Sequence, residues 1–232
     1  MIIEGRNSVL EALKAGKTFN KLLVAKNSNV ENIVSLAREK GVRVDFVDKK
    51  VLDKTTTNNH QGVVGYITDF EYTPLDKLLS KENLFLVLLD GIEDPHNLGS
   101  IIRVCECAGV DGVIIERNRA CAVTDTVVKV SAGAISHMPV ARVTNLNSTI
   151  DDLKKRGVWC YACEAGDKSM YQVDLKGSIA LVIGSEGKGV SRLTREKCDE
   201  TISIPMFGKV NSLNASTAAA VAIYEAIRQR NN

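Results

Sequence analysis

The C-terminal segment from residue 181 to residue 232 constrains the fold of this chain more than any other stretch. It contains two short apolar runs, Leu181–Ile183 and Thr201–Ile204, and each run ends in a loop of glycine, serine, proline and asparagine. Apolar residues then recur at helical spacing, which predicts an alanine-rich helix that begins near Asn214. The glycines of the first loop permit a sharp turn and let a ligand approach the backbone closely. This segment therefore predicts two strands whose loops lie beside a closely packing helix.

Strand and helix patterns alternate through the preceding hundred residues. Residues 83–89 are a continuous apolar run, which is typical of a central parallel strand buried on both faces. Residues 90–99 are predicted to be the loop beyond its carboxyl end, where open α/β sheets place ligands. Further helices are expected at 100–108, 124–136 and 150–156, and further strands at 110–116, 139–143, 158–163 and 179–183. The alternation predicts an α/β domain built on a doubly wound parallel sheet.

Residues 1–75 are predicted to form a smaller α/β domain. The apolar period there switches between helical and extended spacing. The expected helices are 7–15, 30–40 and 49–56, and the expected strands are 21–25, 42–47 and 60–67. Pro74 and the isolated run LDKLL indicate a linker at 76–82 with one short helix, so the larger domain is expected to span 83–232.

Composition limits the classes of function. The chain has 232 residues, and its 44% apolar content is enough for a substantial core. A formal charge of +2 is no broad electrostatic signal for nucleic acid, which disfavours a function that rests on phosphate contacts alone. The start of the sequence lacks the pattern of a secretory leader, and no apolar run is long enough to span a membrane. We therefore expect a cytoplasmic protein.

The six cysteines are expected to be reduced thiols. The run Trp159-Cys-Tyr-Ala-Cys163 is similar to a thioredoxin-type WCxxC, which needs its first cysteine at a helix N-terminus. Here a helix-like stretch precedes the run, so a strand is expected, and the odd spacing of the cysteines would place their sulfurs on opposite faces. Since no second cysteine pair or nearby histidine completes four ligands, we expect no metal site.

Three motifs resemble a known family in order and spacing. NLGSIIR at 97–103, IGSEGKGV at 183–190 and IPMFGKVNSLNAS at 204–216 resemble the motifs of the SpoU-type RNA 2′-O-ribose methyltransferases of the SPOUT superfamily. GRNSVLEAL at 5–13 and HQGVVGYI at 60–67 are similar to the RNA substrate-binding domain of one branch, the bacterial enzymes that methylate a guanosine of 23S rRNA. The resemblance implies a deep trefoil knot in the C-terminal domain and a homodimer. The pattern alone predicts an ordinary nucleotide-binding sheet.

The resemblance also implies the site residues. The positions that match the family's catalytic residues are Arg103, Asn97, Glu186, Ser212 and Asn214. The positions implied to contact the cofactor, S-adenosyl-L-methionine, are Gly184, Ile204, Leu213, Met206 and Gly208. The implied RNA contacts are Arg6, Asn7, His60, Gln61, His96 and Lys188.

The role of Arg103 stays open between two chemistries. The family proposal makes it the base that removes the 2′-hydroxyl proton. A guanidinium has a pKa above about 12, so a charged clamp on phosphate and on the developing alkoxide needs less perturbation. Glu186 could pair with a guanidinium or be a solvated loop residue. Asn214 could bind substrate or cap the helix that follows it, and His96 would be the base if the motifs were ignored.

Three alternatives remain beside the rRNA methyltransferase. A tRNA 2′-O-methyltransferase uses the same chemistry on another RNA. A non-catalytic RNA-binding protein on the same fold would have no need of the catalytic set. A nicotinamide-dependent enzyme is disfavoured because DGIEDPHNLG after the first strand of the larger domain is not a G-x-G-x-x-G turn.

Overall fold

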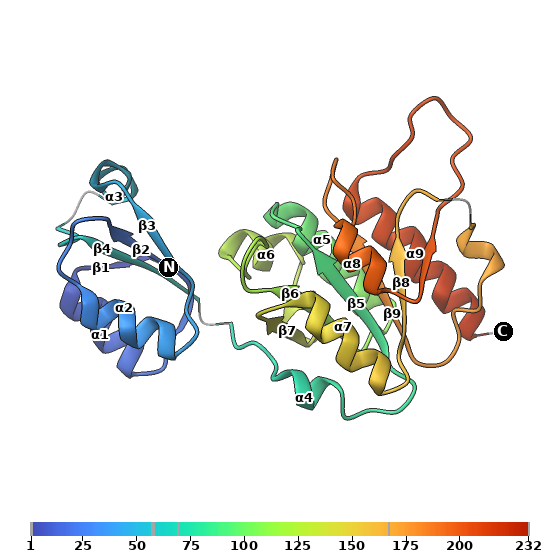
Figure 1. Cartoon of the computed structure of the whole chain (residues 1–232), viewed down its shortest axis with the longest axis horizontal. Coiled ribbons are helices and arrows are strands. Elements are labelled where there is room, and N and C mark those ends of the chain that lie inside the picture. The colour runs from blue at the N-terminus through green and yellow to red at the C-terminus, as the bar shows by residue number, and fades with distance from the viewer. Residues whose placement is uncertain (1, 57–58, 69, 167, 232) are drawn as a thin grey trace. The chain divides into compact units, whose positions relative to one another are not determined.

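The computed structural model describes residues 2–56, 59–68, 70–166 and 168–231. The chain forms two compact units (Figure 1). One unit consists of residues 1–71 with 123–125, and the other consists of residues 72–122 with 126–232.

The N-terminal unit is a four-stranded mixed sheet with helices on its two faces (Figure 1). Its strands are β1 (Ile2–Glu4), β2 (Thr18–Ala25), β3 (Val44–Val47) and β4 (Val63–Thr68), in the spatial order β1-β4-β2-β3. Its helices are α1 (Arg6–Lys14), α2 (Glu31–Glu39) and α3 (Lys49–Thr55). Strand β4 pairs antiparallel with β1 and β2, whereas β2 and β3 run parallel.

The burial of β2 explains its run of consecutive apolar residues. Leu22 and Val24 pack with residues of α1 and α2 on one face of the sheet. Leu23 and Ala25 pack with Leu52 of α3 on the other face. Because successive strand residues point to opposite faces, a strand covered on both faces loses the polar alternation of a surface strand. The three predicted helices and three predicted strands of this unit are confirmed, with ends shifted by a few residues and β1 in addition.

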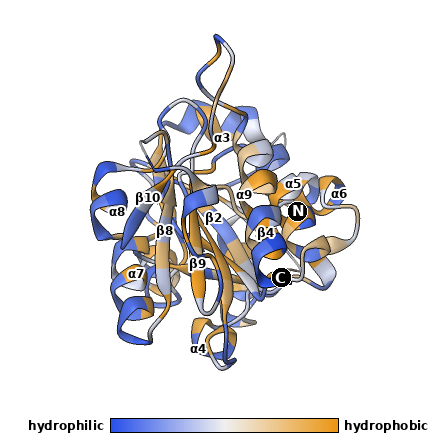
Figure 2. Cartoon of the chain, turned by 90° about the vertical axis from the view of Figure 1, so that its right-hand side faces the viewer, coloured by the Kyte–Doolittle hydropathy of each residue, from blue (hydrophilic) through white to orange (hydrophobic). Residues whose placement is uncertain are grey.

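The C-terminal unit contains a six-stranded sheet in which every pair of neighbours is parallel. Its strands are β5 (Phe85–Asp90), β6 (Gly112–Glu116), β7 (Val140–Val143), β8 (Trp159–Cys163), β9 (Ile179–Gly184) and β10 (Glu200–Ile202). The spatial order is β10-β8-β9-β5-β6-β7, so β5 and β9 lie at the centre. Figure 2 shows β9 as hydrophobic, whereas α8 at the edge is hydrophilic.

Helices cover both faces of this sheet. The remaining elements are α4 (Leu75–Leu78), α5 (Pro95–Cys107), α6 (Asp125–Val130), a 3-10 turn at Ala134–Ser136, α7 (Leu146–Lys155), a 3-10 turn at Met170–Gln172, α8 (Arg192–Lys197) and α9 (Ala215–Arg230). Leu146, Ile150 and Leu153 of α7 pack in the same cluster as Leu86 and Leu88 of β5. Helix α9 packs against α5 and β9. The guanidinium carbon of its Arg230 lies 5.2 Å from the ring centroid of Phe85, a residue of β5 that points to the sheet face opposite that of Leu86 and Leu88.

Three helix predictions need correction. The stretch 90–99, predicted as a loop, already contains the first turn of α5, because Asp94 caps the helix and Pro95 fits its first position. The predicted helix 124–136 is interrupted, since Ala132 and Gly133 adopt positive φ angles of 51° and 90°. Helix α7 begins at Leu146, before the predicted residue 150, because the Asn145 side chain accepts from the Ser148 amide.

The predicted fold class is confirmed as an α/β protein with a parallel-sheet domain that follows a smaller N-terminal α/β unit. The deep trefoil knot stays a prediction.

Candidate active site

The two central strands end side by side, so the first two motifs lie together at the carboxyl ends of the sheet's strands. Asp90 at the end of β5 is paired with Gly184 at the end of β9. The chain beyond Asp90 leads into α5, and the chain beyond Gly184 forms a tight turn at 185–189. Since carboxyl ends of parallel strands form the ligand-binding edge of an open α/β sheet, the topology alone places these loops where a site is expected.

A cluster of three polar side chains joins the three motifs. The Asn97 Nδ2 atom donates to Oε2 of Glu186 at 3.4 Å. The Asn214 Nδ2 atom donates to Oδ1 of Asn97 at 3.0 Å and lies 3.3 Å from the same Glu186 oxygen. Asn97 is buried, with 7% of its surface exposed. We call Asn97, Glu186 and Asn214 the amide–carboxylate cluster.

Two helix caps hold the amides of this cluster in place. The Asp94 carboxylate accepts from the backbone amides of His96 and Asn97 and so begins α5. The Oδ1 atom of Asn214 accepts from the amides of Ser216 and Thr217 at 2.9 and 3.3 Å and so begins α9. The Asn214 side chain therefore uses its oxygen for the cap and its nitrogen for the cluster, which fixes its orientation.

The turn at 185–189 folds back over the end of β9 so closely that it requires glycine. A Cβ atom on Gly184 would lie 2.0 Å from the carbonyl carbon of Gly189 and 2.2 Å from the Val190 nitrogen. The turn is closed by two hydrogen bonds between the backbones of Ser185 and Gly189. Gly189 has a φ of +65°, the left-handed region that favours glycine.

Glu164, just beyond β8, anchors this turn from the neighbouring strand. Its Oε2 atom accepts from the Val190 amide at 2.7 Å, and its Oε1 atom accepts from the Ala165 amide at 3.0 Å. A Cβ atom on Gly189 would lie 1.8 Å from Glu164 Oε2, so only glycine leaves room for the carboxylate.

The turn at 185–189 separates two cavities. Cavity A, of about 340 Å³, lies between the 185–189 turn, the chain beyond β8 and β10, and the start of α9. Its lining residues include Glu164, Gly184, Glu186, Ile204, Met206, Ser212 and Leu213. Cavity B, of about 400 Å³, lies on the side of α5, and its lining includes Glu93, Asp94, Asn97, Arg119, Glu186 and Lys188. Glu186 and Lys188 line both cavities, so the turn is a shared wall.

Cavity A has the volume of a small-molecule site, with a lining that is about equally polar and apolar. Pockets for such ligands are commonly about 300–1,000 Å³, mostly apolar, with a few oriented polar groups. The larger apolar side chains of the lining are Ile183, Ile202, Ile204, Met206 and Leu213, and the turn adds backbone groups to the same wall. A Cβ atom on Gly187 would meet no atom within 4 Å, so the space beside this part of the turn is open.

Not every predicted site residue lies at this edge. Arg103 is exposed on α5 and lines neither cavity. It follows Asn97 by six residues, which places it about 9 Å further along the helix and about 120° around its axis. Gly208 is exposed and does not line cavity A, and His96 is exposed and lines neither cavity. The structure thus joins Asn97, Glu186 and Asn214 and leaves Arg103 apart from them within one chain.

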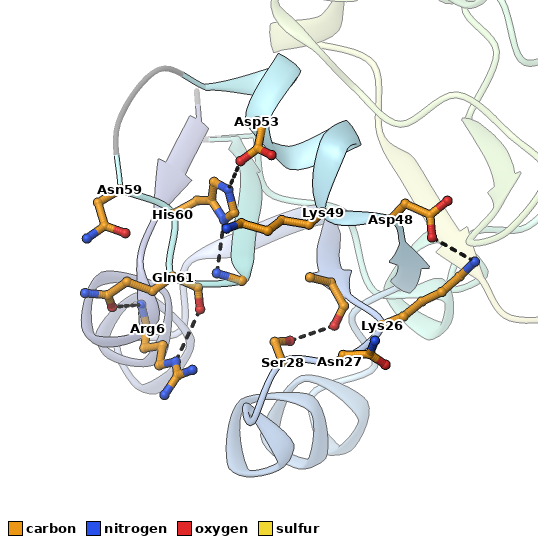
Figure 3. A pocket seen from close by; sticks show the side chains of 12 residues that line it. Arg6, Lys26, Asn27, Ser28, Asp48, Lys49, Asp53, Asn59, His60 and Gln61 are labelled. Carbon is orange, nitrogen blue, oxygen red and sulfur yellow. Dashed lines mark hydrogen bonds and ion pairs between the residues drawn. The ribbon is translucent and has the colours of Figure 1, made fainter.

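The N-terminal unit has a pocket of its own, of about 1,100 Å³ (Figure 3). Its polar lining includes Arg6, Lys26, Asn27, Lys49, Asn59, His60 and Gln61. The Arg6 Nε atom donates to the carbonyl of Gln61 at 3.2 Å, and the Arg6 amide donates to the Gln61 side chain at 3.1 Å. These contacts tie the loop before β4 to the start of α1. Asn7 is exposed and does not line the pocket.

His60 is held inside this pocket wall by both ring nitrogens. Its Nδ1 atom accepts from the Gly62 amide at 3.0 Å, so Nε2 carries the proton and donates to Asp53 Oδ1 at 2.9 Å. Only 5% of the residue is exposed. A direct RNA contact of His60 stays a prediction, and in this structure the ring orients the loop that carries Asn59 and Gln61.

Comparisons with known proteins decide the family. Residues 84–224 match the model of the SpoU rRNA Methylase family, and residues 2–73 match the model for RNA 2′-O ribose methyltransferase substrate binding. The chain belongs to the SpoU family of RNA methyltransferases. A Bacillus subtilis (strain 168) protein, YacO, named in the TrmH family of tRNA/rRNA methyltransferases, is 44% identical over 236 residues, covering 98% of this chain and 95% of its own length.

Solved structures agree with the SpoU assignment. The AdoMet-bound rRNA methyltransferase of Sinorhizobium meliloti is 30% identical with a TM-score of 0.62, and the match covers 98% of this chain and 86% of that one. The TrmH/SpoU tRNA-modifying enzyme of A. aeolicus is 26% identical with a TM-score of 0.59, and the match covers 68% of this chain and 82% of that one.

In this SpoU chain, sequence reasoning missed Glu164 and Asp94. Glu164 follows a strand and carries no motif, so only its position at a strand's carboxyl end could have indicated a role. Asp94 was recognisable, since aspartate before proline is a strong helix start.

Cys160 and Cys198 are buried thiols. Burial raises the pKa of Cys160 to about 12 and the pKa of Cys198 to about 12. Cys160 and Cys163 lie on β8, as the strand prediction required. Among the described residues there is no group of three or more metal-ligating side chains, and no helix is long and apolar enough to cross a membrane.

Proposed function

We propose that this chain transfers the methyl group of S-adenosylmethionine to the 2′-hydroxyl of a ribose in large-subunit rRNA, with a guanosine as the target. The observation that carries the proposal is the amide–carboxylate cluster, because it joins one residue from each of the three motifs beside cavity A. Glu186 belongs both to this cluster and to the wall of cavity A. Oriented polar groups that suit a ribose hydroxyl therefore lie beside a pocket that suits the methyl donor.

The cofactor fits the residues present. Cavity A is within the volume range of ligand pockets, and its wall combines apolar side chains with the residues of a glycine turn. Residues Gly184, Ile204, Met206, Ser212 and Leu213 are the ones that would hold it. When bound, S-adenosylmethionine supplies an electrophilic methyl group on a sulfonium.

The residues of the chain orient the acceptor and stabilise charge. Asn97 and Asn214 hold the Glu186 carboxylate in a fixed position, which lets it orient a hydroxyl or a guanidinium. The ribose oxygen gains a carbon–oxygen bond, the sulfur–carbon bond of the donor breaks, and the 2′-hydroxyl proton leaves to a base or to water. Arg103 acts as a positive clamp on phosphate and on the developing alkoxide.

The proposal includes a homodimer, and the position of Arg103 supports it. Arg103 is exposed on α5 and lies apart from the cluster of its own chain. A second copy packed on the exposed faces of α5 and α9 would bring a guanidinium towards the neighbouring cavity. Mixing two inactive variants, Arg103→Ala and Asn214→Asp, would then restore about half of the wild-type activity in the mixed dimer, and about a quarter in an equimolar mixture whose subunits pair at random.

The choice of rRNA rests on the N-terminal unit. The match to the S. meliloti rRNA methyltransferase covers 98% of this chain, whereas the match to the tRNA-modifying enzyme covers 68%. The pocket of the N-terminal unit presents arginine, lysine and amide side chains that suit RNA phosphates and base edges. A tRNA target remains the second candidate, because the B. subtilis relative is named for both RNAs.

Two measurements test the proposal together. Titration calorimetry measures the binding of S-adenosylmethionine, and tritium transfer measures methylation of unmodified 23S rRNA and of bulk tRNA. We expect cofactor binding and label in the rRNA at a site that resists alkaline cleavage, because a methylated 2′-oxygen cannot attack the phosphate. Label in tRNA would replace rRNA by tRNA as the proposed substrate. Absence of cofactor binding would favour a non-catalytic RNA-binding protein.

A further inference from the structure

The segment 203–214, between β10 and α9, has one side on the cavity and one side in solvent. Ile204, Met206, Asn211, Ser212 and Leu213 line cavity A. The tip at 207–210 lines none of the cavities described above, and a Cβ atom on Gly208 would meet no atom within 4 Å. Figure 1 shows this segment as a loop that stands away from the helices and strands of its unit.

Phe207 at this tip is almost fully in solvent. Its exposed fraction is 97%, the largest among the exposed large apolar residues that the structure describes. Val210 beside it is 71% exposed, whereas Met206 and Leu213, which line the cavity, are 39% and 37% exposed. An aromatic ring in contact with so little of its own chain, one residue from a cavity-lining methionine, is placed to contact something that reaches the cavity from outside.

Two lysines on the loops that border cavity A favour a nucleotide as that occupant. Lys209 lies at the same tip, and Lys188 lies on the turn that borders cavity A. Both are exposed, and within the described parts of the chain neither forms an ion pair. An exposed aromatic ring on the same loop as an exposed cation is a combination that binds unpaired RNA, because a base stacks on the ring and a phosphate contacts the cation.

A second copy of the chain fits the tip less well. A two-fold contact centred on Phe207 would bring the Lys209 side chains of the two copies together, and like charges at a contact oppose association.

We propose that Phe207 stacks on an unpaired base of the RNA substrate adjacent to the target nucleotide, and that Lys209 contacts the phosphate beside that base. Phe207 is then a substrate-positioning residue, which deepens the proposed function and rests on it. The stacked base would fix the RNA at the mouth of cavity A before methyl transfer.

The first test separates RNA positioning from cofactor binding and chemistry. For Phe207→Ala we expect the KM for an unmodified 23S rRNA transcript to rise about tenfold, equivalent to about 1.4 kcal/mol. The kcat should stay within about twofold, and the Kd of S-adenosylmethionine by calorimetry should be unchanged. Phe207→Tyr should restore the KM, Phe207→Leu should not, and Val210→Ala is the matched control from the same tip.

The second test does not depend on methyl transfer. The chain has a single tryptophan, so Trp159→Phe removes the native tryptophan, and Phe207→Trp in that background reports on the tip when tryptophan is excited selectively. We expect the 23S rRNA transcript to quench this fluorescence, as stacking on a base requires. Quenching in a protein that transfers no methyl group would refute the proposed function but still support stacking of residue 207 on RNA.

Three results would overturn the inference. An unchanged KM in Phe207→Ala would show that the ring contacts no substrate. Full activity of Phe207→Leu would show an apolar contact without stacking. A fall of Phe207→Ala to monomer mass in light scattering would show that the ring meets a second copy of the chain.

Discussion

The Nδ2 atom of Asn214 donates to the Oδ1 atom of Asn97 at 3.0 Å, across 117 positions of sequence. The bond links the first turn of α5 to the cap of α9, so two motifs hold each other in register. Because the Asn214 oxygen is already used by the α9 cap, the amide cannot rotate to serve another partner.

Asn214→Asp should separate the helix-capping role of this side chain from its role in the amide–carboxylate cluster. The aspartate keeps an oxygen for the Ser216 and Thr217 amides but places a carboxylate against Glu186, where the amide donated before. We expect near-native thermal stability and a loss of methyl transfer of at least about 100-fold. Asn214→Ala removes both roles and should also cost about 1 kcal/mol of folding free energy, measured by urea unfolding. Equal activity of Asn214→Asp and wild type would remove Asn214 from the catalytic set.

Arg103→Ala should strongly reduce turnover without weakening the binding of S-adenosylmethionine. Arg103 lies outside cavity A, so its removal leaves the lining intact. We expect kcat to fall by about 100-fold or more, and the Kd of S-adenosylmethionine to stay unchanged by calorimetry. Arg156→Ala, an exposed arginine after α7, is the matched control. Lost cofactor binding in a folded Arg103→Ala would refute the assignment.

Glu164→Ala should loosen the turn that walls cavity A. The change leaves the buried Val190 amide without its acceptor, at a cost of about 1–3 kcal/mol. We expect the Kd of S-adenosylmethionine to rise about tenfold, with a smaller rise in Glu164→Gln, which retains an oxygen. Glu196→Ala on the exposed face of α8 should bind as wild type does. The prediction fails if Glu164→Ala binds the cofactor with native affinity.

Stability should fall in alkaline solution because of the buried thiols. Burial raises the pKa of Cys160 from 9.0 to about 12 and that of Cys198 equally. Above pH 9 the unfolded chain loses these protons while the folded chain keeps them, so the unfolding free energy decreases with pH until about pH 12. Chemical denaturation at pH 7, 9 and 10.5 measures the slope. Cys160→Ala should have a shallower slope than wild type, and an identical slope would contradict the burial of this thiol.

Much of the secondary structure follows from local sequence. The strand at 83–89 and the helix from Asn214 are correct to within two residues, because a long apolar run and an asparagine cap are local signals. The start of α5 was misplaced, since the polar run DPHN suggests a loop until the Asp94 cap is considered. The interruption after α6 depends on backbone angles at Ala132 and Gly133 that apolar periodicity does not report.

The sequence by itself determined the α/β class and the parallel sheet, because both depend on periodicity and on residue type within a short window. It supplied the motif residues through their resemblance to a known family. Only the tertiary structure decided which of those residues meet. The Asn97–Glu186–Asn214 contacts and the anchoring of Val190 by Glu164 require β9 beside β5 and β8, which is a matter of strand order. Strand order is set by the packing of both sheet faces as a whole, so no local pattern contains it.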